Sequence, residues 1–278
     1  MVRYATRQFF FLIAHARFRM LWHHVLPGPG TTPIVILPGS YSNAADVPAM
    51  FAKRIRSASG QPVILCDHRE SGRSGNDDGT SCHYDLNDMA EDVMRIIQPF
   101  PAVSFVGISM GGMIAQRIAC MYPRRVHSLT LLMSSPDVSI APPTARVQRA
   151  ICREARYYER GLPLRGLLCR WKTHGGTSSA QSKRARWERM RAHGFQSAAQ
   201  HWQAMSTGSL HDLTQIQCPV LILHGDKDEL FPWEHASTLQ RGIAGAKLRC
   251  IRGQGHDLHD ENLDAWVGAM MRNDARDT

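Results

Sequence analysis

The chain has 278 residues, of which 43% are hydrophobic and 21% charged, and its formal net charge is +9. This length and hydrophobic content are sufficient for one well-packed domain with an insertion, and no repeat or low-complexity run interrupts the pattern. No apolar stretch approaches the roughly 20 residues that a transmembrane helix requires, so we expect no transmembrane segment.

The apolar run at 9–14 is too short to span a membrane, and no convincing signal-peptide cleavage site follows it. We interpret it as the first strand of a hairpin that returns through 18–22, with an interfacial membrane anchor as the alternative. The seven cysteines form neither a C-x-x-C motif nor a Cys/His cluster with zinc spacing. Such cysteines are typical of reduced thiols, which predicts a cytoplasmic protein without a metal site.

Further apolar strands are expected near 33–38, 61–67, 102–107, 127–134, 219–225 and 246–251. Helical patterns separate them; one helix is indicated by apolar residues three and four positions apart: Leu86, Met89, Ala90, Val93, Ile96 and Ile97. This alternation predicts an α/β fold with a mostly parallel sheet and helices on both faces. In such sheets, ligands bind beyond the carboxyl ends of the strands.

The alternation stops between Pro136 and Leu213, where prolines open a segment of helical pattern. With the two strands of the hairpin counted, this segment follows the sixth strand. We expect residues 136–213, the cap segment, to form a helical cap on a core made of residues 1–135 and 214–278.

The most informative motif is Gly107-Ile108-Ser109-Met110-Gly111, which follows the apolar run 103–106. A strand leading into G-x-S-x-G and then a helix is the nucleophile-elbow pattern. The two glycines are expected because a side chain at either position would collide with the neighbouring helix and strand. The motif therefore predicts Ser109 as a nucleophile.

An acid and a base follow Ser109 in chain order. The G-x-x-D-x-x-x-P spacing after the strand at 220–223 favours Asp228 as the acid, with Asp226 and Asp137 as alternatives. The base is expected to be His256, because it lies in a glycine-bracketed loop after another strand. The acid would orient the imidazole and stabilise the imidazolium that forms during acyl transfer.

The loop Pro38-Gly39-Ser40-Tyr41 follows the strand near 34–37 and predicts one half of an oxyanion hole. Its donors would be the backbone N–H of Met110 and that of Ser40 or Tyr41. Aromatic residues of the cap and rim are expected to line the substrate pocket: Trp187, Phe195, Trp202, Phe231 and Trp233.

Along nearly the whole chain, these motifs resemble the α/β-hydrolase family. Residues 67–74 resemble its D-x-R-G-x-G-x-S loop, although Glu70 occupies a glycine position, and the oxyanion loop begins Pro-Gly where His-Gly is common. Residues 109–116 and 255–258 are similar to a bacterial esterase subgroup that includes methylesterases of anthracycline biosynthesis such as aclacinomycin methylesterase. The resemblance implies the roles given above to serine, aspartate and histidine, and it implies no metal or organic cofactor.

The cap segment carries thirteen basic and five acidic residues, and so about +8 of the net charge. Five arginines recur every three or four residues, and we call them the arginine stripe: Arg146, Arg149, Arg153, Arg156 and Arg160. A solvated helix face, an acidic substrate, an acidic carrier protein and an anionic membrane surface are the alternatives for it. Nucleic acid is not expected, because no recognition motif accompanies the charge.

The sequence thus predicts a serine hydrolase that cleaves a carboxylic ester through an acyl-enzyme intermediate. One alternative is a biosynthetic thioesterase or cyclase acting on a carrier-bound or natural-product substrate. A second alternative is a ligand receptor with a vestigial site, which the intact set of three residues disfavours.

Overall fold

A computed structural model describes residues 21–40, 42–74, 83–161, 199–207 and 212–271, together with the single residues 165, 179, 181, 184 and 188. The described strands form one seven-stranded sheet in the order β1-β3-β2-β4-β5-β6-β7. Their bounds are β1 His23–Leu26, β2 Ile34–Leu37, β3 Val63–Cys66, β4 Val103–Ile108, β5 Val126–Leu132, β6 Val220–Gly225 and β7 Lys247–Ile251.

Strands β2 to β7 are parallel to their neighbours, and β1 alone pairs antiparallel, with β3, among the described strands. These six strands lie within two residues of their predicted bounds. The predicted hairpin at 9–22 falls mostly outside the described residues. Leu21 and Trp22, its last two positions, precede β1 instead of forming a strand. Among the described strands, the cap segment follows β5 Val126–Leu132.

The described helices are α1 Ala49–Ser59, α2 Leu86–Ile96, α3 Met110–Met121, α4 Ala145–Glu159, α7 Ala199–Thr207, α8 Trp233–Gly242 and α9 Leu263–Met271, with short 3-10 turns η1 Pro123–Arg125, η2 Leu213–Gln215 and η3 Asp260–Asn262. Helix α2 begins with a capping box, in which the Asp85 side chain accepts hydrogen bonds from the N–H groups of Asn87 and Asp88. No helix of the described ranges is long and apolar enough to cross a membrane.

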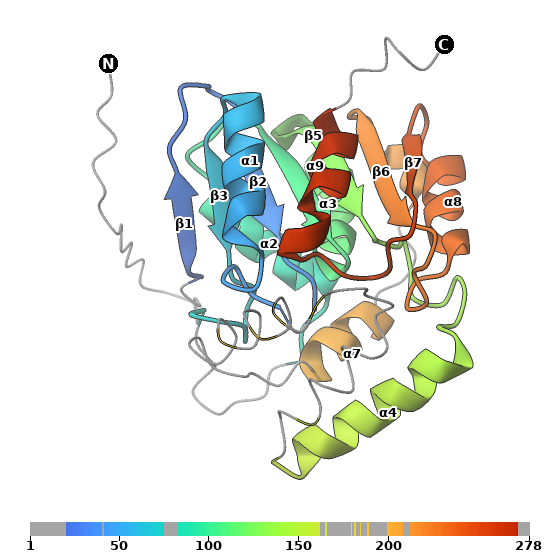
Figure 1. The fold of residues 1–278 in the computed structure, drawn as a ribbon. Coiled ribbons are helices and arrows are strands. Elements are labelled where there is room, and N and C mark those ends of the chain that lie inside the picture. Colours follow the sequence, from blue (N-terminus) through green and yellow to red (C-terminus); the bar gives the residue numbers. More distant parts are fainter. Residues whose placement is uncertain are drawn as a thin grey trace.

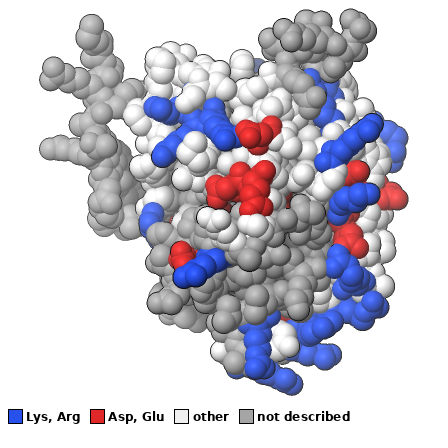
Figure 2. All heavy atoms as spheres, viewed as in Figure 1, with Lys and Arg blue, Asp and Glu red and all other residues white. Residues whose placement is uncertain are grey.

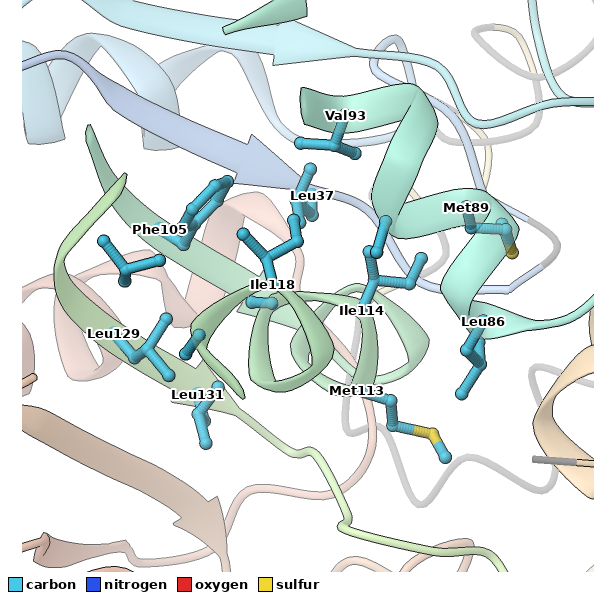
Figure 3. Packing of buried hydrophobic residues seen from close by; sticks show 14 of the residues in the cluster. Leu37, Leu86, Met89, Val93, Phe105, Met113, Ile114, Ile118, Leu129 and Leu131 are labelled. Atoms are coloured by element: carbon cyan, nitrogen blue, oxygen red, sulfur yellow. The ribbon is translucent and has the colours of Figure 1, made fainter. Parts of the chain in front are cut away.

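Apolar side chains cover both faces of the sheet, because successive residues of a strand point to opposite sides. Val35 and Leu37 belong to the core cluster under α2, α3 and α8, while Ile36 belongs to the cluster under α1 and α9. Figure 3 shows side chains of the first cluster, where α2 and α3 pack against each other and against the strands. The helices predicted on both faces are therefore confirmed.

Helices α4 and α7 lie beyond the carboxyl ends of the parallel strands, apart from the sheet-covering helices (Figure 1). Val147 and Ile151 of α4 pack against Leu230 and Phe231, which belong to the loop after β6. Thr144, just before α4, donates its N–H to the Glu229 carbonyl at 3.1 Å. This contact fastens α4 over the edge of the sheet where ligands bind in such folds.

Candidate active site

Ser109 occupies the sharp turn between β4 and α3 and has a positive φ of 52° with ψ of −118°. A Cβ on Gly107 would lie 2.4 Å from Cα of Gly112, and a Cβ on Gly111 would lie 2.2 Å from the Leu37 carbonyl oxygen. Both positions therefore need glycine, as the motif predicted. A strained serine held this tightly presents its hydroxyl at the end of the strand.

Ser109, His256 and Asp228 form one chain of hydrogen bonds. Nε2 of His256 lies 2.9 Å from the Ser109 Oγ, and its Nδ1 lies 2.8 Å from the Asp228 Oδ2. The other carboxylate oxygen, Oδ1, accepts the N–H groups of Leu230 at 3.0 Å and Phe231 at 2.8 Å. Because a carboxylate only accepts, Nδ1 carries the proton and Nε2 is free to accept the serine proton.

The alternative acids have other partners. Asp226 accepts the N–H of Gly253 at 2.6 Å, and so joins the loops after β6 and β7. Asp137 accepts the N–H of Ser139 at 2.7 Å. The spacing argument and the geometry therefore favour the same residue, Asp228.

The predicted oxyanion loop runs beside the serine. A Cβ on Gly39 would lie 3.3 Å from Cβ of Ser109, a tight contact that glycine avoids, so glycine lets the loop approach the serine closely. Ser40 lines the cavity at Ser109. Met110 is the first residue of α3, so its N–H has no acceptor within the helix. Tyr41 lies outside the described residues.

Two buried side chains form hydrogen bonds with the backbone of the loop after β2. His68 donates Nε2–H to the Pro38 carbonyl at 2.9 Å, and burial lowers the pKa of this imidazole to about 3. Asp67 accepts the N–H groups of Ala44 at 2.6 Å and Arg73 at 2.7 Å. The D-x-R-x-x-G-x-S segment thus supports the strand-end loop that faces the serine.

Glu70 stands in this segment where the family pattern has glycine. Its φ of 57° lies in the left-handed region, which glycine adopts without steric cost. Its carboxylate accepts a hydrogen bond from the Tyr84 hydroxyl at 3.1 Å. Glu70 therefore adopts a backbone conformation that suits the glycine of the family pattern.

A cavity opens at Ser109 and His256, and of the predicted pocket residues Trp202 lines it. Trp233 is not among the described residues that line it: this residue begins α8, is 39% exposed and sets its ring edge-on to His224. Phe231 does not line the cavity either, because its ring is buried against His256, at 5.2 Å between centroids. Trp187 and Phe195 lie outside the described residues.

Several lining residues escaped the sequence analysis. Helix α4 contributes Ile151 and Glu154, and the turns after β2 and β7 contribute Asp46 and Asp257. The three carboxyl groups are each at least nine-tenths buried. Two signals were present in the sequence: Ile151 and Glu154 are three residues apart on one helix, and Asp257 follows His256 directly. That these segments meet at one cavity is visible only in the folded structure.

A family model for the alpha/beta hydrolase fold matches residues 32–263. The chain therefore belongs to the α/β-hydrolase family.

Two curated relatives and one solved structure illustrate the likeness. Rhodomycin D methylesterase DauP of Streptomyces sp. (strain C5) is 26% identical over 269 residues, which cover 86% of this chain and 89% of that protein. Serine hydrolase BPHL of Homo sapiens is 24% identical over 246 residues, or 85% and 77% of the two chains. An esterase (EaEST) from Exiguobacterium antarcticum has a TM-score of 0.72 at 22% identity over 90% of this chain and 93% of that chain.

These comparisons confirm the class that the motifs predicted, an enzyme of the α/β-hydrolase family that hydrolyses carboxylic esters. Within the described ranges, no group of three or more His, Cys, Asp or Glu side chains has an arrangement suited to a metal ion.

Proposed function

We propose that Ser109 is the nucleophile of this ester hydrolase, His256 its general base and acid, and Asp228 the acid that orients the imidazole. The observation that supports this most strongly is the unbroken hydrogen-bond chain from the Ser109 Oγ through His256 to Asp228, at the wall of a cavity. A serine hydroxyl is a weak nucleophile by itself, and a base within 3 Å is what activates it.

In the first half of the reaction, Nε2 of His256 takes the Ser109 proton while Oγ attacks the ester carbonyl carbon. The tetrahedral oxyanion is held by the N–H of Met110 and that of Ser40 or Tyr41. When the intermediate collapses, the carbon–oxygen bond to the alcohol breaks and His256 returns its proton to the leaving oxygen. An alcohol departs and the acyl group remains on Ser109.

In the second half, a water molecule gives a proton to His256 and attacks the acyl-enzyme carbonyl. Collapse breaks the bond to Oγ, and His256 protonates the serine. The carboxylic acid product leaves, and no group other than water is consumed. Asp228 stays an acceptor throughout and holds Nδ1–H toward itself.

The substrate we propose is a methyl ester with a bulky acyl part. Two relatives that cover most of this chain, DauP and DnrP, are named for methylester cleavage of rhodomycin D, at 26% and 27% identity. The cavity has apolar walls from separate elements, including Val47, Ile151, Trp202 and Leu258, which suit a large apolar acyl group.

The arginine stripe supports the proposal that an acidic carrier protein delivers the substrate. Its five residues are exposed, four on α4 and Arg160 directly after it. Figure 2 shows Lys and Arg side chains gathered at the lower edge of the molecule, where Figure 1 places α4. The opposite face of α4 supplies Ile151 and Glu154 to the cavity, so the positive charge lies outside the pocket and the carboxyl groups lie inside. This separation favours an acidic carrier that docks on α4 over an anionic group in the pocket, and keeps carrier-bound thioester cleavage as the second candidate function.

The carrier proposal is tested by salt. Because the Debye length falls from about 10 Å at 0.1 M to about 3 Å at 1 M, docking on exposed charges weakens with ionic strength. Reversal of Arg149, Arg153 and Arg156 to Glu should raise KM for an acyl-carrier substrate at low salt and leave a small neutral ester unaffected. Equal effects on both substrates would make the stripe a solvated face.

The cap segment and the compartment are also proposals. We assign residues 136–213 as the cap on the strength of α4 and α7, which lie over the carboxyl edge of the sheet (Figure 1). The five cysteines within the described residues are free thiols, among them the buried Cys66, whose pKa burial raises. Free thiols suit a reducing compartment, which supports the cytoplasm.

The nucleophile is tested with Ser109→Ala and, as a control, Ser128→Ala, whose hydroxyl bonds Ser104 on the sheet. The first variant should lose fluorophosphonate labelling and on the order of 10⁶ in turnover of a p-nitrophenyl ester. The control should keep both. Retention of more than a few per cent of activity by folded Ser109→Ala would overturn the assignment.

A further inference from the structure

His224 is a fully buried histidine that the mechanism above does not use. It lies near the end of β6, four residues before Asp228, and none of its surface is exposed. Its Nε2 lies 2.8 Å from the Phe231 carbonyl oxygen and 3.5 Å from the Asp228 Oδ2. One imidazole nitrogen thus faces both ends of the turn that carries the acid.

The surroundings of His224 define its protonation. The Phe231 carbonyl can only accept, so the proton is on Nε2, and the buried Nδ1 has no hydrogen-bond partner. The Trp233 ring packs edge-on to the imidazole at 5.9 Å between centroids. Burial is the largest cause that lowers the pKa of His224; Asp228 opposes this, and His256 adds to it. His235 on α8 is the other histidine in electrostatic contact. His224 is therefore a neutral donor.

The backbone of Phe231 is held at both ends. Its N–H donates to Oδ1 of Asp228 at 2.8 Å, and its carbonyl accepts from His224. Its ring in turn contacts His256 edge-on at 5.2 Å. The donor on β6, the carboxylate and the base are consequently connected through one residue, and β6 is held between β5 and β7 in the sheet.

We propose that His224 is a positioning residue, which fixes the turn 228–231 and so holds the Asp228 carboxylate toward His256. The inference rests on the roles proposed above for Asp228 and His256. The approach of Nε2–H to Oδ2 also draws negative charge from the oxygen that faces His256. Removal of this donor leaves more charge there, which stabilises the His256 imidazolium.

Two substitutions separate positioning from simple packing. His224→Leu fills the site without a donor and should lower kcat on the order of 10–100-fold, with a smaller change in KM, because the carboxylate is no longer held in place. The acidic limb of the kcat/KM profile should move to higher pH. His224→Gln retains an amide N–H near the position of Nε2 and should restore most of kcat and the parent pH profile.

His201 on α7 offers a matched control. It too is buried, lies 2.8 Å through Nε2 from a backbone carbonyl, that of Arg69, and has a buried Nδ1 without a hydrogen-bond partner. His201→Leu should cost folding stability to a similar degree, because the same kind of donor is lost. The pH limb of this variant should stay at the parent position.

The outcomes are distinct. An unshifted acidic limb in folded His224→Leu, or an equal shift in His201→Leu, overturns the inference. If the leucine variant does not fold, His224→Asn replaces it, because its shorter amide cannot reach the Phe231 carbonyl as Gln does; equal profiles for Asn and Gln also overturn it. If Asp228→Asn keeps full activity, the proposed function itself fails. If Asp228→Asn loses activity but the His224 substitutions change neither kcat nor the pH profile, the present inference alone is refuted.

Discussion

Replacement of Asp228 by Asn exchanges one carboxylate oxygen for an NH₂ group at nearly constant volume. In the parent, Oδ2 accepts from His256 and Oδ1 accepts from the N–H groups of Leu230 and Phe231. The amide nitrogen must face one of these two sets of donors. If it faces the backbone, two buried N–H groups lose their acceptor, at about 1–3 kcal/mol each. We therefore expect the NH₂ group to face His256.

An NH₂ group at Nδ1 selects the wrong tautomer of His256. Nδ1 becomes an acceptor, Nε2 carries the proton, and the nitrogen 2.9 Å from the Ser109 Oγ can no longer take the serine proton. Loss of an orienting acid by this route costs on the order of 10⁴ in kcat, or about 5 kcal/mol in the activation barrier. The same NH₂ group at Asp226 disturbs an exposed contact to Gly253 and an exposed ion pair with Lys227, both away from His256.

The assay is turnover of a p-nitrophenyl ester by Asp228→Asn and Asp226→Asn, with circular dichroism to verify folding. We expect a loss on the order of 10⁴ for the first and less than about 10-fold for the second. Similar activities in the two variants, or a larger loss at Asp226, would refute the reasoning about the tautomer and the choice of acid.

Three further outcomes follow from the packing. Gly111→Ala, with its Cβ 2.2 Å from the Leu37 carbonyl oxygen, should destabilise the fold by about 3 kcal/mol or abolish expression, whereas Gly268→Ala, with open space around it, should be neutral or stabilising by up to about 1 kcal/mol in urea unfolding. Glu70→Gly relieves a positive φ and should raise the unfolding midpoint, with a gain of up to about 1–2 kcal/mol, while Glu70→Ala should not. His68 has a pKa lowered by burial from 6.5 to about 3, so the unfolded chain binds its proton first as pH falls. The free energy of unfolding should therefore decline below pH 6.5 by up to about 1.4 kcal/mol per unit from this residue, and His68→Gln should make the decline between pH 7 and 4 shallower.

Local pattern was sufficient for the parallel strands and for the position of the elbow. A buried parallel strand is a short apolar run between breakers, and Gly107 and Gly111 mark a turn that no other residue accommodates. The spacing around Asp228 also favoured the residue that the fold brings to His256. Such features depend on residues close together in the sequence, so the chain alone determined them.

The pocket depended on contacts between distant segments. Trp202 and Trp233 are alike as residues, but α7 turns one toward the cavity and α8 holds the other at the surface against His224. Asp46 and Glu154 approach the serine only because the loop after β2 and helix α4 meet above the sheet. The sequence by itself determined which chemistry this protein carries, and tertiary packing alone decided which side chains surround it, since non-local contacts leave no periodic signal along the chain.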